Sequence, residues 1–468
     1  MAVDLVVKNG KIVTQSGIIE GGVAVDDGKI VAVTGPANLP AADKVVDAKG
    51  HLVMPGAIDT HVHYGLYNRL EDDIRDSTQV QAIGGVTTSF HMKPDARSFK
   101  AGIPEMIRAI DNNSCIDVAP NMTVMSLEHI EEIPYAVKHG VTSFKHFWNR
   151  PEYEFLGIKY LERGQLHDSF RKIRELGGIA MNHCEDFEIT KKLTSELKAA
   201  GAHGLAAWND CRPDYCELVM IWQAAIASKI TGCPMFIVHT TVANAKDVVD
   251  WARVNGVEMY WETTPTYLRF VKTDKIGARA KVNPPVRTRG HSDAIWRGIT
   301  EGWIDCIGTD HCPMPLSLKL PQGEETDIWD AGLAFPASET MLPYMISEAF
   351  NKRGVPIERI AQLTSTNAAR IHSLDNKGSI SIGKDADLVI VDPKKRVKID
   401  DKVLHFSSIR DWSLFEGEVM TGFPVMTIMR GEIIAKDGEC VAKPGYGKMV
   451  RRTPHKGPRN PSLRELLN

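Results

Sequence analysis

The sequence lacks the features that would place it in a membrane, a secretory pathway or a nucleic-acid complex. No apolar run approaches the length that spans a bilayer, and the start of the chain has neither the n-region nor the h-region of a signal peptide. The formal net charge is only −3 over 468 residues, which favours neither nucleic acid nor an anionic membrane surface as a partner. We therefore expect a cytoplasmic protein that acts on a small molecule.

Cysteine motifs are also missing. The eight cysteines are scattered along the chain, and none of them forms a Cys-x-x-Cys pair. Free thiols are the expected state, because neither a disulfide framework nor a thiolate metal site has this spacing. Cys184 and Cys312 lie beside candidate metal ligands, but we interpret both as small buried apolar side chains.

The pattern of expected strands and helices divides the chain into three parts. Residues 1–52 read as short strands separated by the turn signals Asn9-Gly10 and Asp27-Gly28. Residues 53–375 alternate short apolar strands with segments of helical periodicity, and residues 376–468 return to short strands before a Pro/Gly-rich tail. Since both ends are rich in strands, we expect them to assemble into one small β-sandwich.

The central part predicts the main domain. Its eight strand candidates are residues 52–59, 85–92, 116–124, 141–147, 178–184, 235–239, 257–263 and 304–309. Strand–helix alternation repeated in this way predicts an α/β protein with a (β/α)8 TIM barrel. A doubly wound sheet is the competing architecture, but it usually carries a Gly-rich nucleotide loop after its first strand, and this sequence has none there.

A His-x-His motif follows the first of these strands. His61 and His63 alternate along an extended segment, so their side chains lie on the same face and can converge on one point. Two neutral imidazoles that converge are typical of a zinc-type site. Alone the motif is weak, because histidines pair by chance.

Four further ligand-type residues end other strand candidates, and they strengthen the motif. They are Lys145, His183, His239 and Asp310. In a barrel, functional groups collect at the carboxyl ends of the strands. We therefore expect four histidines, one lysine and one carboxylate to face the same mouth of the barrel.

These residues, together with longer motifs, resemble the amidohydrolase superfamily with binuclear metal centres. The finer resemblance is to its cyclic-amide hydrolases, which are hydantoinases, dihydropyrimidinases and allantoinases. It is carried by the ligand positions above and by the segments 84–88, 283–287, 309–311 and 383–388. The resemblance extends over nearly the whole chain, including the divided β-sandwich.

The resemblance implies two divalent metal ions, usually zinc. His61, His63 and Asp310 would hold one ion, and His183 and His239 the other. Lys145, carbamylated by carbon dioxide, would bridge them, since an unmodified ammonium group has no acceptor.

The resemblance also implies a mechanism and an assembly. A hydroxide that bridges the metals would attack a ring carbonyl. Asp310 would act as general base and then as general acid, although a role as metal ligand alone stays open. The ring would open to an N-carbamoyl or ureido acid, and the family resemblance suggests a homotetramer or a homodimer.

Departures from the family pattern bear on the substrate. Dihydroorotases usually carry an arginine where this chain has Gly65, and dihydropyrimidinases usually carry a tyrosine where it has Arg150. Both departures favour a hydantoin-type or allantoin-type ring. A dihydropyrimidinase, a deaminase or acyclic amidase on the same scaffold, and a non-catalytic scaffold relative stay as alternatives.

Candidate substrate contacts follow from the family and from residue chemistry. The family binds the ring amide through backbone groups, which points to Asn283 and Gly332, although Asn283 can equally be a turn residue before proline. Tyr64 and Trp148 would line the mouth of the pocket or belong to the core. Arg150 would meet an anionic or ureido substituent.

Overall fold

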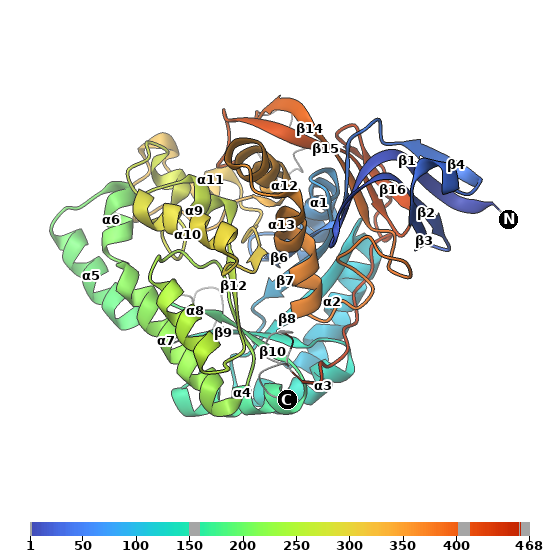
Figure 1. The fold of residues 1–468 in the computed structure, drawn as a ribbon. Coiled ribbons are helices and arrows are strands. Elements are labelled where there is room, and N and C mark those ends of the chain that lie inside the picture. Colours follow the sequence, from blue (N-terminus) through green and yellow to red (C-terminus); the bar gives the residue numbers. More distant parts are fainter. Residues whose placement is uncertain (1, 149–159, 401–411, 458, 460–468) are drawn as a thin grey trace.

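A parallel barrel organises the computed structural model, which describes residues 2–148, 160–400, 412–457 and 459 (Figure 1). Eight strands are hydrogen-bonded in chain order, and a bridge between Val62 and His311 joins the last strand region to the first. The strands are β6 (Ala57–Val62), β7 (Val86–Lys93), β8 (Asp117–Thr123), β9 (Ser143–Phe147), β10 (Ile179–His183), β11 (Met235–Ile237), β12 (Met259–Thr263) and β13 (Cys306–Ile307). The predicted (β/α)8 fold is confirmed.

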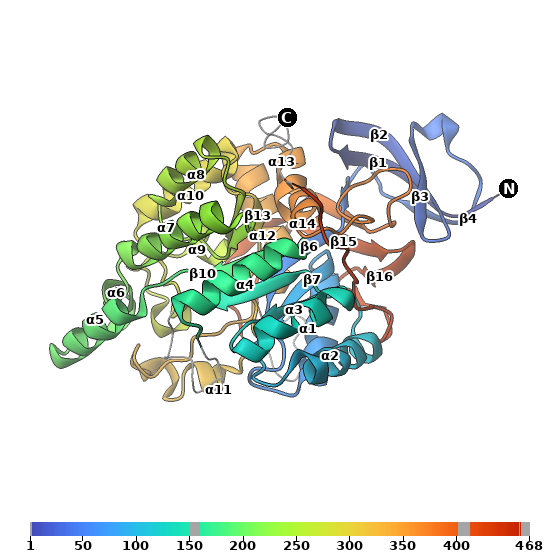
Figure 2. The ribbon, with the colours of Figure 1, turned by 90° about the horizontal axis from the view of Figure 1, so that it is seen from below.

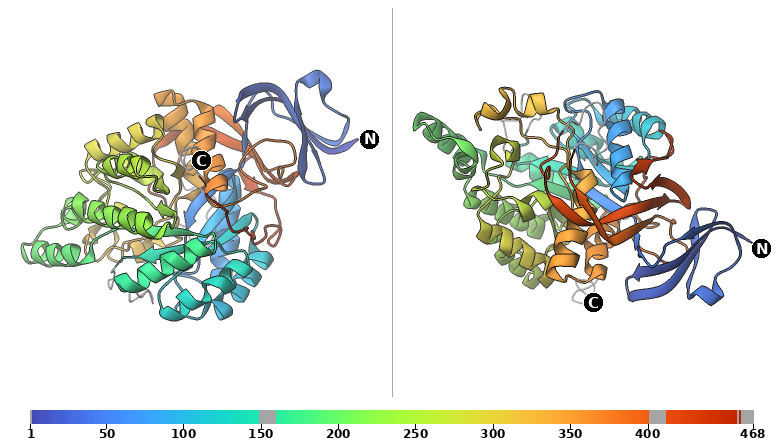
Figure 3. Two further views of the ribbon diagram at one scale, coloured as in Figure 1. Left: turned by 60° about the horizontal axis from the view of Figure 1, so that its bottom comes forward. Right: turned by 90° about the horizontal axis from the view of Figure 1, so that it is seen from above.

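Helices cover the outside of these strands, as Figures 2 and 3 show. Those that follow successive strands are α1 (Leu70–Ile83), α2 (Phe99–Asn113), α3 (Leu127–Lys138), α4 (Arg163–Glu175), α7 (Asp214–Thr231), α8 (Ala245–Val254) and α10 (Arg289–Glu301). Local sequence explains their ends. Ser98 and Ser126 accept backbone N–H bonds at the starts of α2 and α3, and Gly232 and Gly302 end α7 and α10 in left-handed backbone.

Further helices lie in the connections. They are α5 (Phe187–Ala199), α6 (Gly204–Asp210), α9 (Pro265–Arg269), α11 (Leu316–Lys319), α12 (Met341–Tyr344), α13 (Ile357–Ala361) and α14 (Asn367–Ile371). π-Helical turns at Met345–Lys352 and Gln362–Thr366 continue α12 and α13. None of the helices in the described part of the chain is both long enough and apolar enough to cross a bilayer.

The two ends of the chain form a second sheet beside the barrel (Figure 1). Its strand order is β17-β16-β15-β14-β5-β1-β2-β3, with β4 also paired to β1. The strands are β1 (Val3–Thr14), β2 (Gly17–Asp26), β3 (Lys29–Thr34), β4 (Ala42–Asp47), β5 (Leu52–Pro55), β14 (Leu388–Lys398), β15 (Val419–Met429), β16 (Glu432–Lys436) and β17 (Glu439–Cys440). We call this unit the end sheet. Apolar side chains from both ends of the chain, Val7 and Leu388 among them, share its core.

Two local predictions differ from the structure. The segment predicted as one strand over residues 52–59 is two strands, β5 in the end sheet and β6 in the barrel. The chain changes sheets at Gly56, where a Cβ atom would lie 2.3 Å from the Thr87 side chain. Asn9-Gly10 is not a hairpin turn but a bulge inside β1, whereas Asp27-Gly28 does connect β2 to β3 as predicted. The domain boundaries at residues 52 and 375 stay predictions.

Apolar side chains fill the interior of the barrel. Ile58, Phe90, Met181, Phe236 and Tyr260 are all buried in one cluster with residues of α14. A barrel filled in this way is not a channel, so chemistry is left to the ends of the strands.

A buried group of charges joins the end sheet to the barrel. Lys377 Nζ lies 2.8 Å from Asp117 Oδ2 and 2.6 Å from Asp387 Oδ2, and the Arg430 guanidinium lies 2.5 Å from Asp117. Burial acts to lower the pKa of Lys377, but Asp387 and Asp117 outweigh it, so that its pKa lies above the usual value. The lysine therefore stays charged and holds two buried carboxylates together.

Replacement of Lys377 by methionine should destabilise the protein strongly. The substitution leaves Asp117 and Asp387 buried beside one another with less compensation, which typically costs about 3–5 kcal/mol of unfolding free energy. Urea denaturation measures the effect. As a control, Lys44→Met removes a pair with Glu432 in which the side chains are 63% and 58% exposed, and it should leave the midpoint unchanged. Equal midpoints for both variants would contradict the role of Lys377.

Candidate active site

The ligand-type residues predicted from the sequence meet in one pocket at the carboxyl ends of the barrel strands. The residues concerned are His61, His63, Lys145, His183, His239 and Asp310, and all six line this pocket. His61, Lys145 and His183 belong to β6, β9 and β10. His239 and Asp310 lie just after β11 and β13 in left-handed backbone, with φ of 42° and 56°, so the chain turns sharply where their side chains enter the site.

Three of these residues form a ready-made cation site. One ligand atom each from His61, His63 and Asp310 lies within 4.8 Å of the other two. Asp310 Oδ1 is 3.3 Å from His61 Nε2 and 3.1 Å from His63 Nε2. His61 Nε2 is buried and makes no hydrogen bond in the described part of the chain. Two imidazole nitrogens and one carboxylate oxygen at this spacing fit a divalent metal.

The opposite ring nitrogens of both histidines are held by acceptors. His61 Nδ1 donates to Glu262 Oε1 at 3.0 Å, and His63 Nδ1 donates to the Met92 carbonyl at 2.6 Å. Burial and then the charge of Lys145 hold the pKa of His61 well below its usual range, so the ring is neutral. Each imidazole is thereby fixed in the tautomer whose Nε2 atom can bind a metal.

His183 and His239 form a second group beside Lys145. His183 Nδ1 lies 2.9 Å from His239 Nε2, and the other nitrogen of His183 lies 3.1 Å from Glu185 Oε2. Lys145 is only 1% exposed, and its ammonium group lies 5.3 Å from the ring of Phe147. Lys145 is therefore buried in the same pocket as these two histidines.

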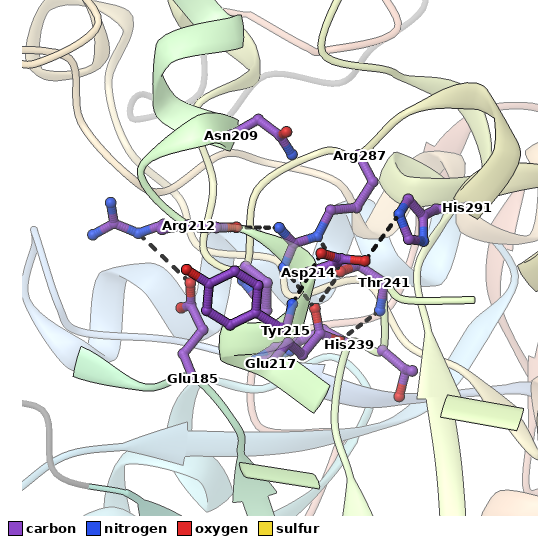
Figure 4. A network of polar contacts seen from close by, with 12 residues as sticks. Glu185, Asn209, Arg212, Asp214, Tyr215, Glu217, His239, Thr241, Arg287 and His291 are labelled. Carbon is purple, nitrogen blue, oxygen red and sulfur yellow. Dashed lines mark hydrogen bonds and ion pairs between the residues drawn. The ribbon is translucent and has the colours of Figure 1, made fainter. Parts of the chain in front are cut away.

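A buried polar network braces this second group from behind (Figure 4). Glu217 accepts the Thr241 backbone N–H at 2.8 Å and pairs with Arg287 at 2.9 Å, and Arg287 Nε donates to Thr241 Oγ1 at 2.9 Å. Thr241 lies two residues after His239, so the network fixes the turn that carries this histidine. Arg212 Nε, 3.6 Å from Glu185 Oε1, supports His183 in the same way.

Glu262 of β12 connects His61 to the segment that carries His239, and no role for it was predicted from the sequence. Its buried carboxylate accepts from the Thr60 hydroxyl, from His61 Nδ1 and, at 3.0 Å, from the backbone N–H of His239. Burial raises its pKa to about 7. An acidic residue inside a short apolar strand was the available signal.

Asp59 connects the first barrel strand to the segment after the last one, and no role for it was predicted from the sequence either. It accepts from the Thr309 backbone N–H at 3.0 Å, from the Thr309 hydroxyl at 2.6 Å and from Ser338 Oγ at 2.8 Å. Thr309 immediately precedes Asp310. Asp59 thereby ties β6 to the turn that positions Asp310.

The predicted substrate contacts are placed differently from one another. Asn283 lines the pocket, while Gly332 lies beside the lining residues Leu333 and Ala334. Gly332 itself packs against Met314, whose sulfur would lie 2.6 Å from an added Cβ atom. Arg150 lies outside the described residues.

Tyr64 and Trp148 belong to the core, which is the second of the two alternatives that the sequence left open, and neither is among the residues that line this pocket. Tyr64 is fully buried and donates from its hydroxyl to Gln81 Oε1 at 2.7 Å, and Trp148 is buried with Nε1 donating to Asn182 Oδ1 at 3.1 Å. The reason is strand alternation. Tyr64 follows His63, and Trp148 follows Phe147. Because His63 and Phe147 face the pocket, the side chains that follow them point the opposite way.

The cysteines agree with the prediction of free thiols. None of the eight forms a disulfide in the structure, and Cys184 is buried. Cys312 is also buried and contributes to the pocket wall.

Comparison with known proteins identifies chains that are similar over nearly their full length. The model described as "Amidohydrolase family" matches residues 184–433. An L-hydantoinase of Paenarthrobacter aurescens is 30% identical over 461 residues, which cover 96% of this chain and 98% of the relative. An allantoinase of Rubrobacter xylanophilus is 31% identical, with 98% and 100% covered. The solved structure of the L-hydantoinase (dihydropyrimidinase) from Arthrobacter aurescens superposes with a TM-score of 0.89 at 29% identity, covering 96% and 100%.

Substitution of Glu262 by glutamine should weaken metal binding. The amide no longer accepts from all three of its present donors, so His61 loses the partner that fixes its ring, and loss of such a partner typically costs about 10- to 100-fold in metal affinity. Competition with a chelator for zinc measures this. Glu258→Gln, at the residue directly before the same strand, is the matched control and should bind zinc like the parent. Equal affinity in E262Q and the parent would contradict the assignment.

Proposed function

The chain belongs to the amidohydrolase family, and on that premise we propose that it hydrolyses an amide C–N bond in the ring of a small cyclic amide. The observation that carries this proposal is the approach of His61, His63 and Asp310 ligand atoms to within 4.8 Å at the mouth of a barrel. Relatives named hydantoinase and allantoinase, similar over nearly the full length, support a five-membered ureide or hydantoin ring.

Two divalent metals, zinc in our proposal, fit the donor set. His61, His63 and Asp310 would hold one ion, and His183 and His239 the other, with carbamylated Lys145 between them. The fit rests on three imidazoles (His61, His63 and His183) that each have one ring nitrogen against an oxygen acceptor, and on a lysine buried beside them. Bound ions of this kind polarise a carbonyl and lower the pKa of water towards neutrality.

The residues of the chain would divide the remaining work. Asp310 would take the proton from the attacking water and deliver it to the ring nitrogen as the C–N bond breaks. The Met92 carbonyl accepts from His63 Nδ1 and so fixes the ring of His63, whose Nε2 lies 3.1 Å from Asp310 Oδ1. Asn283 and the segment beside Gly332 would bind the ring amide through backbone groups. The product would be an N-carbamoyl or ureido acid.

We also propose a cytoplasmic homo-oligomer, either a tetramer or a dimer. The resemblance to the cyclic-amide hydrolases supports it. Size-exclusion chromatography with light scattering tests the assembly, and a monomer at micromolar concentration would refute it.

Replacement of Asp310 by asparagine should abolish turnover while metal stays bound. Asparagine keeps one oxygen for the metal but cannot accept the proton, and loss of general acid–base catalysis typically costs about 10²–10⁴-fold in kcat. The measurements are kcat and metal content by mass spectrometry. Asp293→Asn, on the exposed side of α10, is the control. Substantial residual activity in metal-replete D310N would refute the role of Asp310 in proton transfer.

A substrate panel tests the reaction itself. Zinc-loaded protein should open the ring of hydantoin, a 5-aryl-hydantoin or allantoin faster than it hydrolyses dihydrouracil or dihydroorotate. Release of ammonia without ring opening would instead indicate a deaminase. A folded protein that holds no metal when supplied with zinc and bicarbonate would favour a non-catalytic scaffold.

A further inference from the structure

Two lysines are buried beside the pocket, and neither forms an ion pair with a carboxylate among the described residues. Lys319 is 0% exposed and Lys281 is 4% exposed. Burial lowers the pKa of both, that of Lys281 to about 7. In the described part of the chain, their hydrogen-bond acceptors are all backbone carbonyls. A buried amine of this kind costs free energy, so its position calls for an explanation.

The two side chains connect three segments that are distant in sequence. Lys319 Nζ donates to the carbonyl of Lys281 at 2.7 Å and to that of Gly332 at 2.8 Å. Lys281 Nζ donates to the carbonyl of Ala331 at 2.7 Å and to that of Trp329 at 3.2 Å. The Gly332 N–H returns to the Lys319 carbonyl at 3.0 Å and closes the set.

Aromatic rings complete the surroundings of both amines. Lys281 Nζ lies 4.3 Å from the ring centre of Trp208, and Lys319 Nζ lies 5.8 Å from that of Trp412. Each amine therefore has two carbonyl acceptors and one aromatic ring face around it. The two amines thus have the same kind of surroundings.

The tethered segments are the ones that form one side of the pocket. Val282 and Asn283 follow Lys281, and Leu333 and Ala334 follow Gly332, and all four line the pocket. These residues lie outside helices and strands, so no ladder of hydrogen bonds holds their peptide groups in place. The lysines supply the donors that a neighbouring strand would otherwise supply.

The geometry of the peptide bond determines where the N–H groups beside these carbonyls point. In a trans peptide the N–H points opposite to the C=O, so the two carbonyls held by Lys319 turn the N–H groups of Val282 and Leu333 away from it. Among the described residues, neither N–H has an acceptor, although Val282 is only 1% exposed. Buried N–H groups without acceptors, such as that of Val282, are rare. Leu333 is partly exposed, and both residues line the pocket.

We propose that Lys319 and Lys281 are positioning residues for substrate recognition, which fix the Val282 and Leu333 N–H groups as donors for a carbonyl oxygen of the ring amide. This inference rests on the proposed function and adds the means by which the ring is held. A donor placed on a peptide carbonyl also polarises that peptide and strengthens its N–H as a donor. The ligand class is a planar ring with exposed imide or ureide carbonyls.

Lys319→Met tests the proposal on the holoenzyme, because methionine has a similar length and no donor. KM for the best ring substrate should rise about 10- to 100-fold, the effect of losing well-placed hydrogen bonds, while kcat changes less and metal content is unchanged. Lys198→Met is the matched control, since its exposed amine lies 5.3 Å from the ring of Trp329 but holds no carbonyl in the described residues. It should keep the KM of the parent.

Two further variants separate positioning from simple stability. Lys319→Gln keeps N–H donors and should recover most of the affinity lost in K319M. Lys281→Met should raise KM in the same direction and replaces K319M as the test if that variant does not fold. KM within about twofold of the parent in the folded, metal-replete methionine variant would overturn the proposal, even if its thermal midpoint falls. Failure of the parent to hydrolyse any ring on the panel would refute the proposed function itself, and this inference with it.

Discussion

One buried carboxylate holds both halves of the site in register. Glu262 reaches from β12 to the ring of His61 and to the backbone of His239, so these two pocket residues share a single acceptor. The Thr60 hydroxyl completes its surroundings. Because the carboxylate is buried away from water, loss of any of these three donors would cost free energy. The carboxylate therefore fixes the positions of His61 and His239 relative to each other.

The parts of the site that follow from strand geometry could be predicted from the sequence. Alternation put His61 and His63 on one face, and the rule that barrel strands present function at their carboxyl ends brought Lys145, His183, His239 and Asp310 to the same pocket. The same alternation, counted one residue further, explains why Tyr64 and Trp148 point into the core. Their aromatic character suggested a pocket, but each directly follows a pocket-lining residue, His63 or Phe147, and therefore points the other way.

Other features depend on contacts between distant residues and leave little trace in a local pattern. Glu262 could be seen as an unusual residue in an apolar strand, but its partners Thr60 and His61 lie far from it in the sequence. Asn9-Gly10 has the composition of a hairpin turn, yet pairing with β2 continues on both sides of it, and the two residues become a bulge. The prediction of a single strand over residues 52–59 was wrong for a similar reason. Only the packing of Gly56 on Thr87 shows that the chain changes sheets between β5 and β6.

The division of the end sheet between the two chain termini has a consequence for synthesis on the ribosome. Strand β5 pairs with β1 on one side and with β14 on the other, and β14 emerges only after the entire barrel has been translated. Until then the amino-terminal strands expose an unpaired edge, which is the kind of surface that attracts other nascent chains. The last strands to be made therefore cover this edge. A truncated or stalled product would keep an unpaired strand edge that is prone to aggregation, even if its barrel had folded.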